Sequence, residues 1–247
     1  MRRDAFLARG AFLARGALLA AGVPLTGCAA SRPADRSAPG PAPAPGLRIV
    51  VLGDSLAVGT GASAPENGFI FRAYLRVRER YPRSRIDDLA LGGSTVADVV
   101  RLQVPRLAAA GEPAVAVAIV CVGGNDVVRR TAPAAFAASY ATLVARVRAV
   151  LPAAALVLCG VPDVALSPLF TGRDGDTVAR LAREDDGAVR ALAHRARAGF
   201  VDLYAVTRAR RADAVRFLSD DRFHPSDAGH AAFAEALAPV LLRAVRR

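Results

Sequence analysis

Apolar and polar residues alternate along residues 47–247 in blocks that predict strands and helices in turn. Short continuous apolar runs that end in turn residues indicate buried strands, whereas apolar residues three or four apart indicate amphipathic helices. Strands are therefore expected at 47–52, 86–91, 114–122, 154–159 and 200–203. Helices are expected at 67–81, 97–110, 133–150, 176–198 and 225–245.

Prolines mark several of these boundaries. Pro82 follows the first helical block and ends it, and Pro133 stands at the start of another, where its missing N–H costs nothing. Pro105 lies inside the block at 97–110, and we expect it to kink or break that helix.

Strands that alternate with helices predict an α/β fold with a parallel sheet and right-handed crossovers. In such sheets the ligand site lies beyond the carboxyl ends of the strands. Three polar or glycine-rich clusters follow the first three predicted strands, and we expect them to meet at one edge. They are Asp54-Ser55, Gly92-Gly93-Ser94 and Gly123-Gly124-Asn125-Asp126.

A serine hydroxyl needs a base to become a nucleophile, and histidine is the usual one. Of the three histidines, His194 falls in an Ala/Arg-rich helix and is expected at the surface. His230 falls inside the last predicted helix, where a structural role is expected. His224 precedes Pro225, which disfavours helical geometry and places it in a loop. His224 is therefore the candidate base for Ser55.

Asp221 lies three residues before His224 and can hydrogen-bond the far imidazole nitrogen, which fixes the tautomer. Its neighbour Asp220 is expected to face solvent. Donors for an oxyanion could come from the Ser55 N–H, a glycine N–H after the second strand and the Asn125 amide. Taken singly, the glycines could equally form a plain turn, and Asn125 an Asx-type turn.

The residues in these clusters resemble the four sequence blocks of the SGNH (GDSL-type) hydrolase family. The blocks are Gly53-Asp54-Ser55-Leu56, Gly93, Gly123-x-Asn125-Asp126 and Asp221-x-x-His224. The resemblance runs from about residue 47 to the C-terminus. One departure is Asp88 in the second block, where many members carry Asn.

That resemblance implies a three-layer α/β/α flavodoxin-like fold with a five-stranded parallel sheet in the order 2-1-3-4-5. It implies Ser55 as nucleophile, His224 as base and Asp221 as its orienting partner, with an acyl-enzyme intermediate in ester hydrolysis. The oxyanion hole would comprise the Ser55 N–H, the Gly93 N–H and the Asn125 amide. Supporting positions would be Asp54, Gly92, Gly124 and Asp126. No cofactor or metal is implied.

The sequence of residues 1–27 predicts an export signal. Four arginines precede a short apolar run, which is too short to span a bilayer. Leu25-Thr26-Gly27-Cys28 resembles a bacterial lipobox, which implies cleavage before Cys28 and lipidation of its thiol. Residues 28–46 are a Pro/Ala-rich linker, and 47–247 form the hydrolase domain. We therefore expect an envelope lipoprotein held to the membrane through Cys28; Arg2-Arg3 is a weak twin-arginine signal.

The formal charge is +11, and all 33 basic residues are arginines. The sequence shows no basic block interleaved with aromatics and no helix-turn-helix or zinc pattern, so nucleic-acid binding is disfavoured. The expected partner is a small-molecule, lipid or acylated-sugar ester.

Three further expectations concern single segments. Cys121 and Cys159 fall in adjacent strands and are expected as buried thiols rather than a disulfide, because pairing within a parallel sheet is geometrically awkward. Residues 167–176 are expected to form a long loop. Within it, Leu169 and Phe170 could line an acyl pocket or simply lie on the surface.

Two other functions remain open at this point. A non-catalytic binding lipoprotein could share the fold, although no catalytic residue is missing. A flavodoxin-like electron carrier would need a Ser/Thr-rich phosphate loop after the first strand, where this chain has Asp54. No Gly-x-Ser-x-Gly elbow is present, which disfavours an α/β-hydrolase.

Overall fold

The computed structural model describes residues 46–108 and 114–246. The predicted signal peptide, the lipobox with Cys28 and nearly all of the linker lie outside the described residues.

The described domain is built on a five-stranded sheet in which every pairing is parallel. The strand order is β2-β1-β3-β4-β5, which confirms the predicted topology. The strands are β1 (Arg48–Gly53), β2 (Arg85–Asp88), β3 (Val115–Cys121), β4 (Ala155–Cys159) and β5 (Gly199–Val201).

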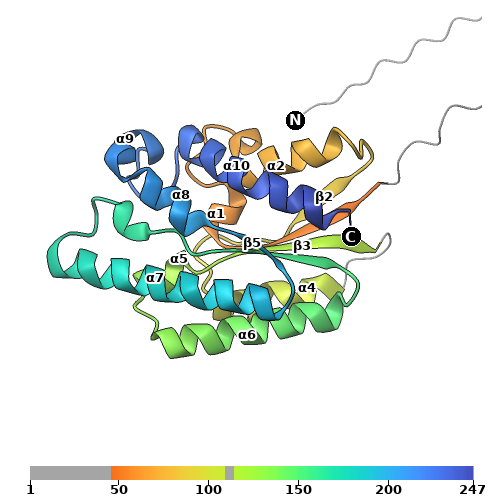
Figure 1. Cartoon of the computed structure of the whole chain (residues 1–247), viewed down its shortest axis with the longest axis horizontal. Helices are drawn as coiled ribbons and strands as arrows, with labels where there is room; N and C mark the ends of the chain where they lie inside the picture. The colour runs from red at the N-terminus through yellow and green to blue at the C-terminus, as the bar shows by residue number, and fades with distance from the viewer. Residues whose placement is uncertain (1–45, 109–113, 247) are drawn as a thin grey trace, which may run out of the picture. The chain divides into compact units, whose positions relative to one another are not determined.

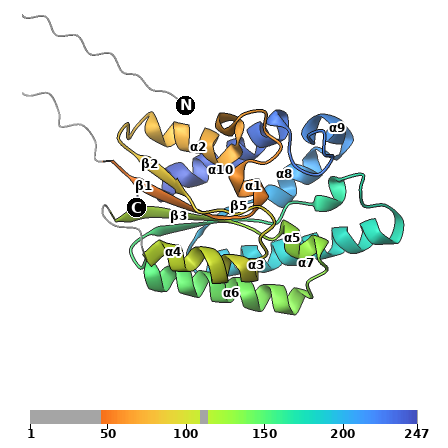
Figure 2. The ribbon, with the colours of Figure 1, turned by 180° about the vertical axis from the view of Figure 1, so that it is seen from behind.

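Helices cover both faces of this sheet and make three layers (Figures 1 and 2). One face carries α1 (Ser55–Val58), α2 (Phe69–Arg78) and α10 (Asp227–Ala244). The other carries α3 (Val96–Asp98), α4 (Val104–Ala108), α6 (Pro133–Val150) and α7 (Gly172–Arg195). Shorter helices are α5 (Gly124–Val128), α8 (Leu203–Ala209), α9 (Ala214–Phe217), η1 (Pro65–Asn67), η3 (Val164–Leu166) and η4 (Arg211–Asp213).

Alternate residues of the strands divide the core in two, because successive side chains of a strand point to opposite faces. Ile49 and Val51 pack under α2 and α10, whereas Val50 and Leu52 pack under α6 and α7. Strands that are buried on both faces have continuous apolar sequences. This is why β1 and β3 could be predicted from the sequence.

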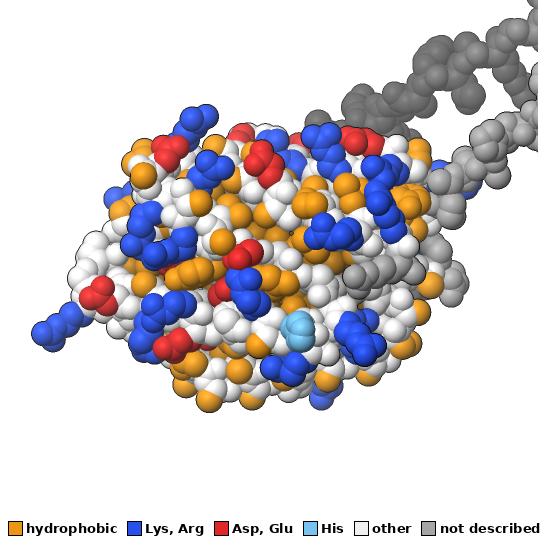
Figure 3. Space-filling model, in the orientation of Figure 1, with side chains coloured by type: hydrophobic (Ala, Val, Ile, Leu, Met, Phe, Trp, Pro, Cys, Tyr) orange, Lys and Arg blue, Asp and Glu red, His pale blue; other side chains and the backbone are white. Residues whose placement is uncertain are grey.

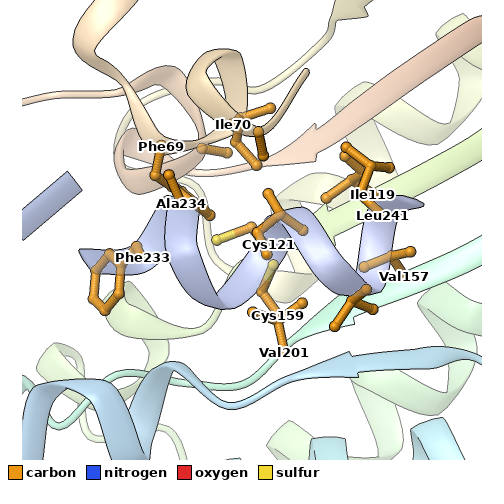
Figure 4. Packing of buried hydrophobic residues seen from close by; sticks show 14 of the residues in the cluster. Phe69, Ile70, Ile119, Cys121, Val157, Cys159, Val201, Phe233, Ala234 and Leu241 are labelled. Atoms are coloured by element: carbon orange, nitrogen blue, oxygen red, sulfur yellow. The ribbon is translucent and has the colours of Figure 1, made fainter. Parts of the chain in front are cut away.

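Cys121 and Cys159 are both free, buried thiols in the structure. They belong to the core cluster between the sheet and α10, where Figure 4 shows them beside Phe233 and Val201.

The segment predicted as a helix at 97–110 with an irregularity at Pro105 is helical over 96–108, and its hydrogen bonding changes just before Pro105. The chain forms α3, then a π-helical segment η2 (Val99–Gln103), then α4. Pro105 has no N–H to donate, so it contributes no hydrogen bond to an ordinary helical ladder. The wider π turn, in which the Val104 N–H donates to the Val99 carbonyl five residues back, immediately precedes Pro105, and α4 continues through that residue.

Other boundaries also differ from those expected, and a capping side chain fixes the start of two of the helices, α8 and α10. The predicted loop at 167–176 is shorter, since α7 begins at Gly172. Leu203 belongs to α8 rather than to the fifth strand, because the Asp202 side chain accepts a hydrogen bond from the Ala205 N–H and caps that helix. The last helix begins at Asp227, after the cap Ser226.

Two further differences concern polar segments. The second strand was expected at 86–91 but ends at Asp88, where the Asp88 carboxylate accepts a hydrogen bond from the Ala90 N–H in a turn. The helices α8, η4 and α9 were not predicted at all.

The surface carries arginines scattered among acidic and apolar side chains on the face shown in Figure 3. Several are paired locally, as Arg101 is with Asp98 and Arg180 is with Glu184. None of the helices within the described residues has the length and apolarity that crossing a membrane requires.

One acidic residue on the buried side of α7 departs from this pattern. Asp185 follows Val178, Leu181 and Ala182 at helical spacing, so it faces the core, and it is fully buried. Neither of its carboxyl oxygens has a hydrogen-bond partner. Burial, with smaller contributions from the nearby charges of Asp126 and Glu184, raises the pKa of Asp185 to about 7.

Replacing Asp185 by Asn should stabilise the protein more at pH 8 than at pH 5. The unfolded carboxyl titrates at about 4, so below that pH both states are protonated and ionisation of the group has no effect on stability. As the pH rises toward 7 the unfolded state alone loses its proton, and stability is lost. Thermal melts should show an Asp185→Asn gain on the order of 1 kcal/mol or more at pH 8. Asp176→Asn, an exposed site in the same helix, is the control. Equal effects at both pH values would contradict this assignment.

Candidate active site

Ser55 lies where β1 ends and α1 begins. Gly53, the last residue of β1, approaches β3 so closely that a Cβ there would lie 2.1 Å from the Cys121 carbonyl oxygen. Asp54 then caps α1, because its Oδ1 accepts a hydrogen bond of 3.0 Å from the Leu56 N–H. Ser55 is thus the first residue of a capped helix at the carboxyl edge of the sheet.

Three polar side chains form a hydrogen-bonded row at this edge. Ser55 Oγ lies 2.8 Å from His224 Nε2, and His224 Nδ1 lies 2.6 Å from Asp221 Oδ2. The side chains of His224 and Asp221 are 19% and 45% exposed, so the row runs from the edge of the core to solvent. The structure therefore brings together the three residues that the sequence analysis had singled out.

The loop that carries Asp221 and His224 is folded back on itself. The Ser219 N–H donates to the His224 carbonyl at 2.8 Å. Asp221 Oδ1 accepts hydrogen bonds from the Phe223 N–H, the His224 N–H and the Ser219 hydroxyl at 2.8–2.9 Å. Partial burial acts to raise the pKa of Asp221, but these bonds and the bond from the His224 ring outweigh it and hold that pKa well below its usual range. Asp221 is therefore ionised at neutral pH.

A glycine lets a second loop approach this one. Gly61 has a φ of +94°, and a Cβ there would lie 2.4 Å from the Pro225 carbonyl oxygen and 2.9 Å from His224 Cβ. The sequence analysis missed Gly61, because a lone glycine in a loop carries no signal of what approaches it.

The glycines after β2 lie beside the serine. A Cβ on Gly92 would be 4.0 Å from Ser55 Cβ, so this segment passes directly over the hydroxyl-bearing residue. Gly93 has a φ of +77°, a left-handed conformation that favours glycine, and its carbonyl accepts a hydrogen bond of 3.0 Å from Arg129 Nη2.

Asn125 is oriented by the same segment. Its Nδ2 donates to the Ser94 carbonyl at 3.0 Å, which uses one of the two amide hydrogens and leaves a second for another acceptor. Asn125 and Gly124 line the same pocket as Ser55.

Two buried aspartates brace these loops. Asp126 Oδ2 accepts a hydrogen bond of 2.9 Å from the Val96 N–H, which ties α5 to the start of α3. Asp54 caps α1, and a Cβ on Gly124 would lie 3.9 Å from its Oδ2. Burial raises the pKa of Asp54 to about 7 against the lowering effect of backbone hydrogen bonds from Leu56 and Gly123.

Gln103 is a supporting residue that the sequence analysis missed. It is fully buried at the end of the π-helical segment. Its Oε1 accepts from the Gly53 N–H at 2.8 Å, and its Nε2 donates to the Gly53 carbonyl at 2.7 Å and to Ser94 Oγ at 3.3 Å. One side chain thus holds the end of β1 and the segment after β2 in register. The only sequence signal was a polar residue on the apolar side of a helix two positions before Pro105.

A pocket opens at Ser55 and His224 and extends past the ends of β3 and β4 toward α8 and α9. Its empty volume is about 630 Å³, including the open mouth. Most of its wall is apolar, and the side chains that form it include Leu56, Val164, Leu166, Phe217, Phe223 and Phe233.

Leu169 and Phe170 are not among the residues that line this pocket, so of the two alternatives left open for them the structure favours the one outside it. Leu169 is half-exposed, and the Phe170 ring packs edge-on against Phe223 with centroids 6.3 Å apart. The early start of α7 holds Phe170 behind the pocket wall rather than in it.

The remaining histidines lie where the sequence placed them. His194 is exposed on α7. His230 is fully buried, and its ring joins the Phe69 N–H at 3.3 Å to the Thr60 carbonyl at 3.1 Å. Across residues 46–108 and 114–246, no group of three or more His, Cys, Asp or Glu side chains is arranged to hold a metal ion.

Known structures share this fold. A lipase from a goat rumen metagenome is 20% identical over 78% of this chain and 97% of its own, with a TM-score of 0.63. The esterase EstA from Pseudoalteromonas sp., inhibited by monoethylphosphonate, is 14% identical over 81% and 99%, with a TM-score of 0.61. The acetylxylan esterase Axe2 from Geobacillus stearothermophilus is 20% identical over 82% and 95%, with a TM-score of 0.57.

Among curated proteins, none matches the sequence significantly. A family model, by contrast, matches residues 51–232, which span all four sequence blocks from Ser55 to His224. The chain belongs to the GDSL-like lipase/acylhydrolase family and is an ester-hydrolysing serine hydrolase.

Proposed function

We propose that the protein hydrolyses carboxylic esters through a Ser55-His224-Asp221 triad and an acyl-enzyme intermediate. The observation that carries the proposal is the continuous row of hydrogen bonds, 2.8 Å and then 2.6 Å, from the serine hydroxyl to the carboxylate. A serine at a helix start beside an oriented imidazole is the arrangement that nucleophilic acyl transfer requires.

In the first step, Ser55 Oγ attacks the ester carbonyl and its proton passes to His224 Nε2. The C–O bond to the alcohol then breaks, and His224 returns the proton to the departing oxygen. In the second step, His224 takes a proton from water, the hydroxide attacks the acyl-Ser55 carbonyl, and the acid leaves as Ser55 regains its proton. The ionised Asp221 favours the imidazolium that forms in each step.

The oxyanion formed in both steps would accept hydrogen bonds from the Ser55 N–H, the Gly93 N–H and the free hydrogen of the Asn125 amide. The first N–H groups of a helix have no acceptor within that helix. The Ser55 N–H, at the start of α1, is therefore able to donate to the oxyanion. Preorganised donors of this kind stabilise developing charge without reorganisation cost. The bond from Asn125 to the Ser94 carbonyl supplies that preorganisation.

We further propose that the enzyme works at the cell envelope, attached to the membrane through lipidated Cys28. Support comes from the residues before 47: the arginine-rich start, the short apolar run and Leu25-Thr26-Gly27-Cys28, followed by the Pro/Ala-rich linker. In that compartment the available esters are lipids and acylated polysaccharides.

Triad substitutions should abolish turnover of a simple ester such as p-nitrophenyl butyrate. Ser55→Ala and His224→Ala should each lower kcat by about 10⁴-fold or more, because nucleophile and base act as one unit. Asp221→Asn should also lower kcat strongly, whereas the adjacent Asp220→Asn should not, since it is the Asp221 carboxylate that bonds to the His224 ring and N–H. Circular dichroism would verify that the variants fold. Wild-type rates in a folded Ser55→Ala variant would refute the mechanism.

Gln103→Leu should lower kcat by roughly 10-fold with little change in KM, because it frees Gly53 and the Ser94 segment while leaving the pocket wall intact. The Gly53 N–H left without its Gln103 acceptor should also lower stability by about 1–3 kcal/mol, whereas the Gly53 carbonyl keeps its bond of 3.1 Å from the Leu91 N–H. Rates are therefore compared well below the melting temperature. Arg101→Ala, in the same π-helical segment but exposed, serves as the control. An unchanged kcat in the folded Gln103→Leu variant would show that Gln103 only packs.

Cys28→Ser should release the protein from the membrane without loss of esterase activity. In a bacterial host, the wild type should incorporate labelled fatty acid and sediment with membranes, and Cys28→Ser should do neither. Cys159→Ala, which alters a buried cysteine, should still be labelled. Label that persists in Cys28→Ser would overturn the anchoring proposal.

A further inference from the structure

The pocket that opens at Ser55 contains a carboxylate that ester hydrolysis does not use. Asp163 follows β4 in the segment Gly160-Val161-Pro162-Asp163 and lines the pocket together with Ser55 and His224. It is only 1% exposed, in a wall that is otherwise mostly apolar. A charged group in such a place is costly unless something compensates it.

The backbone of Asp163 is satisfied, but its side chain is not. The Asp163 N–H donates to Thr207 Oγ1 at 2.9 Å, and the Thr207 hydroxyl bonds in turn to carbonyls of α8. Both carboxylate oxygens, however, are buried without a hydrogen-bond partner. Among the described residues, few buried side chains are in this condition, and of these Asp163 is the one that lines the pocket at Ser55.

The charge of Asp163, in contrast, is compensated. One guanidinium nitrogen each of Arg208 and Arg211 lies 3.7 Å from Asp163 Oδ2, which is close enough for attraction but too far for a hydrogen bond. Both arginines are about half-exposed and reach in from α8 and η4. Asp163 therefore lacks hydrogen-bond donors rather than positive charge.

This distinction identifies the kind of group that would complete the site. A ligand ammonium would bring a third cation beside Arg208 and Arg211, and repulsion would oppose it. A neutral hydroxyl donates a hydrogen bond and adds no charge, and it fits a carboxylate whose charge is already balanced. An alkyl group would leave both oxygens desolvated and unpaired, which is unfavourable.

We propose that Asp163 is a specificity-determining residue that accepts a hydrogen bond from a hydroxyl of the substrate, so that the portion of the ester entering this pocket is hydroxylated. This inference rests on the proposed esterase function and goes beyond it by naming the substrate class. The hydroxyl comes either from the acyl chain, as in a hydroxyacyl ester, or from the alcohol, as in a glyceryl or sugar ester. A site built to bind a hydroxyl rejects the analogue that lacks it much more strongly than an apolar pocket rejects an added hydroxyl.

Two matched substrate pairs distinguish these sources. The first compares p-nitrophenyl 3-hydroxybutyrate with p-nitrophenyl butyrate, which differ only by a hydroxyl on the acyl side. The second compares 2,3-dihydroxypropyl butyrate with propyl butyrate, which differ only on the alcohol side. We expect the wild-type protein to favour the hydroxylated member of one pair by about tenfold or more in kcat/KM.

Asp163→Leu should remove or reverse that preference while the unsubstituted ester is still hydrolysed. Asp163→Asn, which keeps the volume and a neutral acceptor, should show a weaker preference than wild type and covers the case in which the leucine variant does not fold. Asp213→Asn, an exposed acidic residue of η4 that does not line this pocket, should keep the wild-type preference.

Wild-type protein that hydrolyses the unsubstituted esters but shows no preference in either pair would overturn the role of Asp163 and leave the esterase proposal standing. A preference that survives in both folded Asp163 variants would overturn it as well. Wild-type protein that hydrolyses none of the four esters would instead contradict the esterase proposal, and this inference with it.

Discussion

The hydrogen bond between Ser55 Oγ and His224 Nε2 joins residues that are 169 positions apart, and the arrangement of the site depends on it. Ser55 is placed by the end of β1 and His224 by the loop before α10, so the two ends of the domain must be held together. Asp227, the first residue of α10, accepts hydrogen bonds from the Ser63 N–H at 2.8 Å and the Ser63 hydroxyl at 2.5 Å. The buried His230 ring joins α10 to the Thr60 carbonyl and the Phe69 N–H. These bonds fix α10 against the segment that follows α1 and thereby fix the position of His224.

A second set of buried polar groups holds the other loops of the site. Gln103, Asp54 and Asp126 bind backbone amides or carbonyls near Ser55, and each is buried. Burying a carboxyl raises its pKa, so stability is lost as the pH rises from the unfolded-state pKa to the raised one, and such residues are costly as structural elements. The stability lost by burying these groups is offset by what they do for the site, which requires several loops to be held in fixed relative positions.

The strand positions and the meeting of polar residues, Ser55 among them, at one edge of the sheet could be anticipated from the pattern of residues, whereas the sheet order was implied only by the resemblance to the SGNH hydrolase family. Strands buried on both faces form apolar runs, and the residues just after them must converge at one edge. The same reading could not find Gln103, because the π turn that aims it inward arises from the restraint of Pro105 and has no periodic pattern. Nor could it find α8, η4 and α9, whose short arginine-rich sequences show little amphipathic contrast. The alternatives left open for Phe170 could not be decided from the sequence, because α7 starts at Gly172, earlier than the run of apolar residues suggested.

The pocket combines an apolar wall with one buried carboxylate, and the two features have different consequences. The wall suits an apolar portion of an ester, whereas Asp163, under our proposal, accepts a hydrogen bond from a hydroxyl on that portion. Both depend on an activated Ser55, which is the central claim.

Labelling with a fluorophosphonate probe, followed by mass mapping of the adduct, tests that claim most directly. The account predicts one adduct on Ser55 in the wild type, none in Ser55→Ala and much slower labelling in His224→Ala. A folded wild-type protein that does not label, or whose adduct maps to another residue such as Ser94, would contradict it.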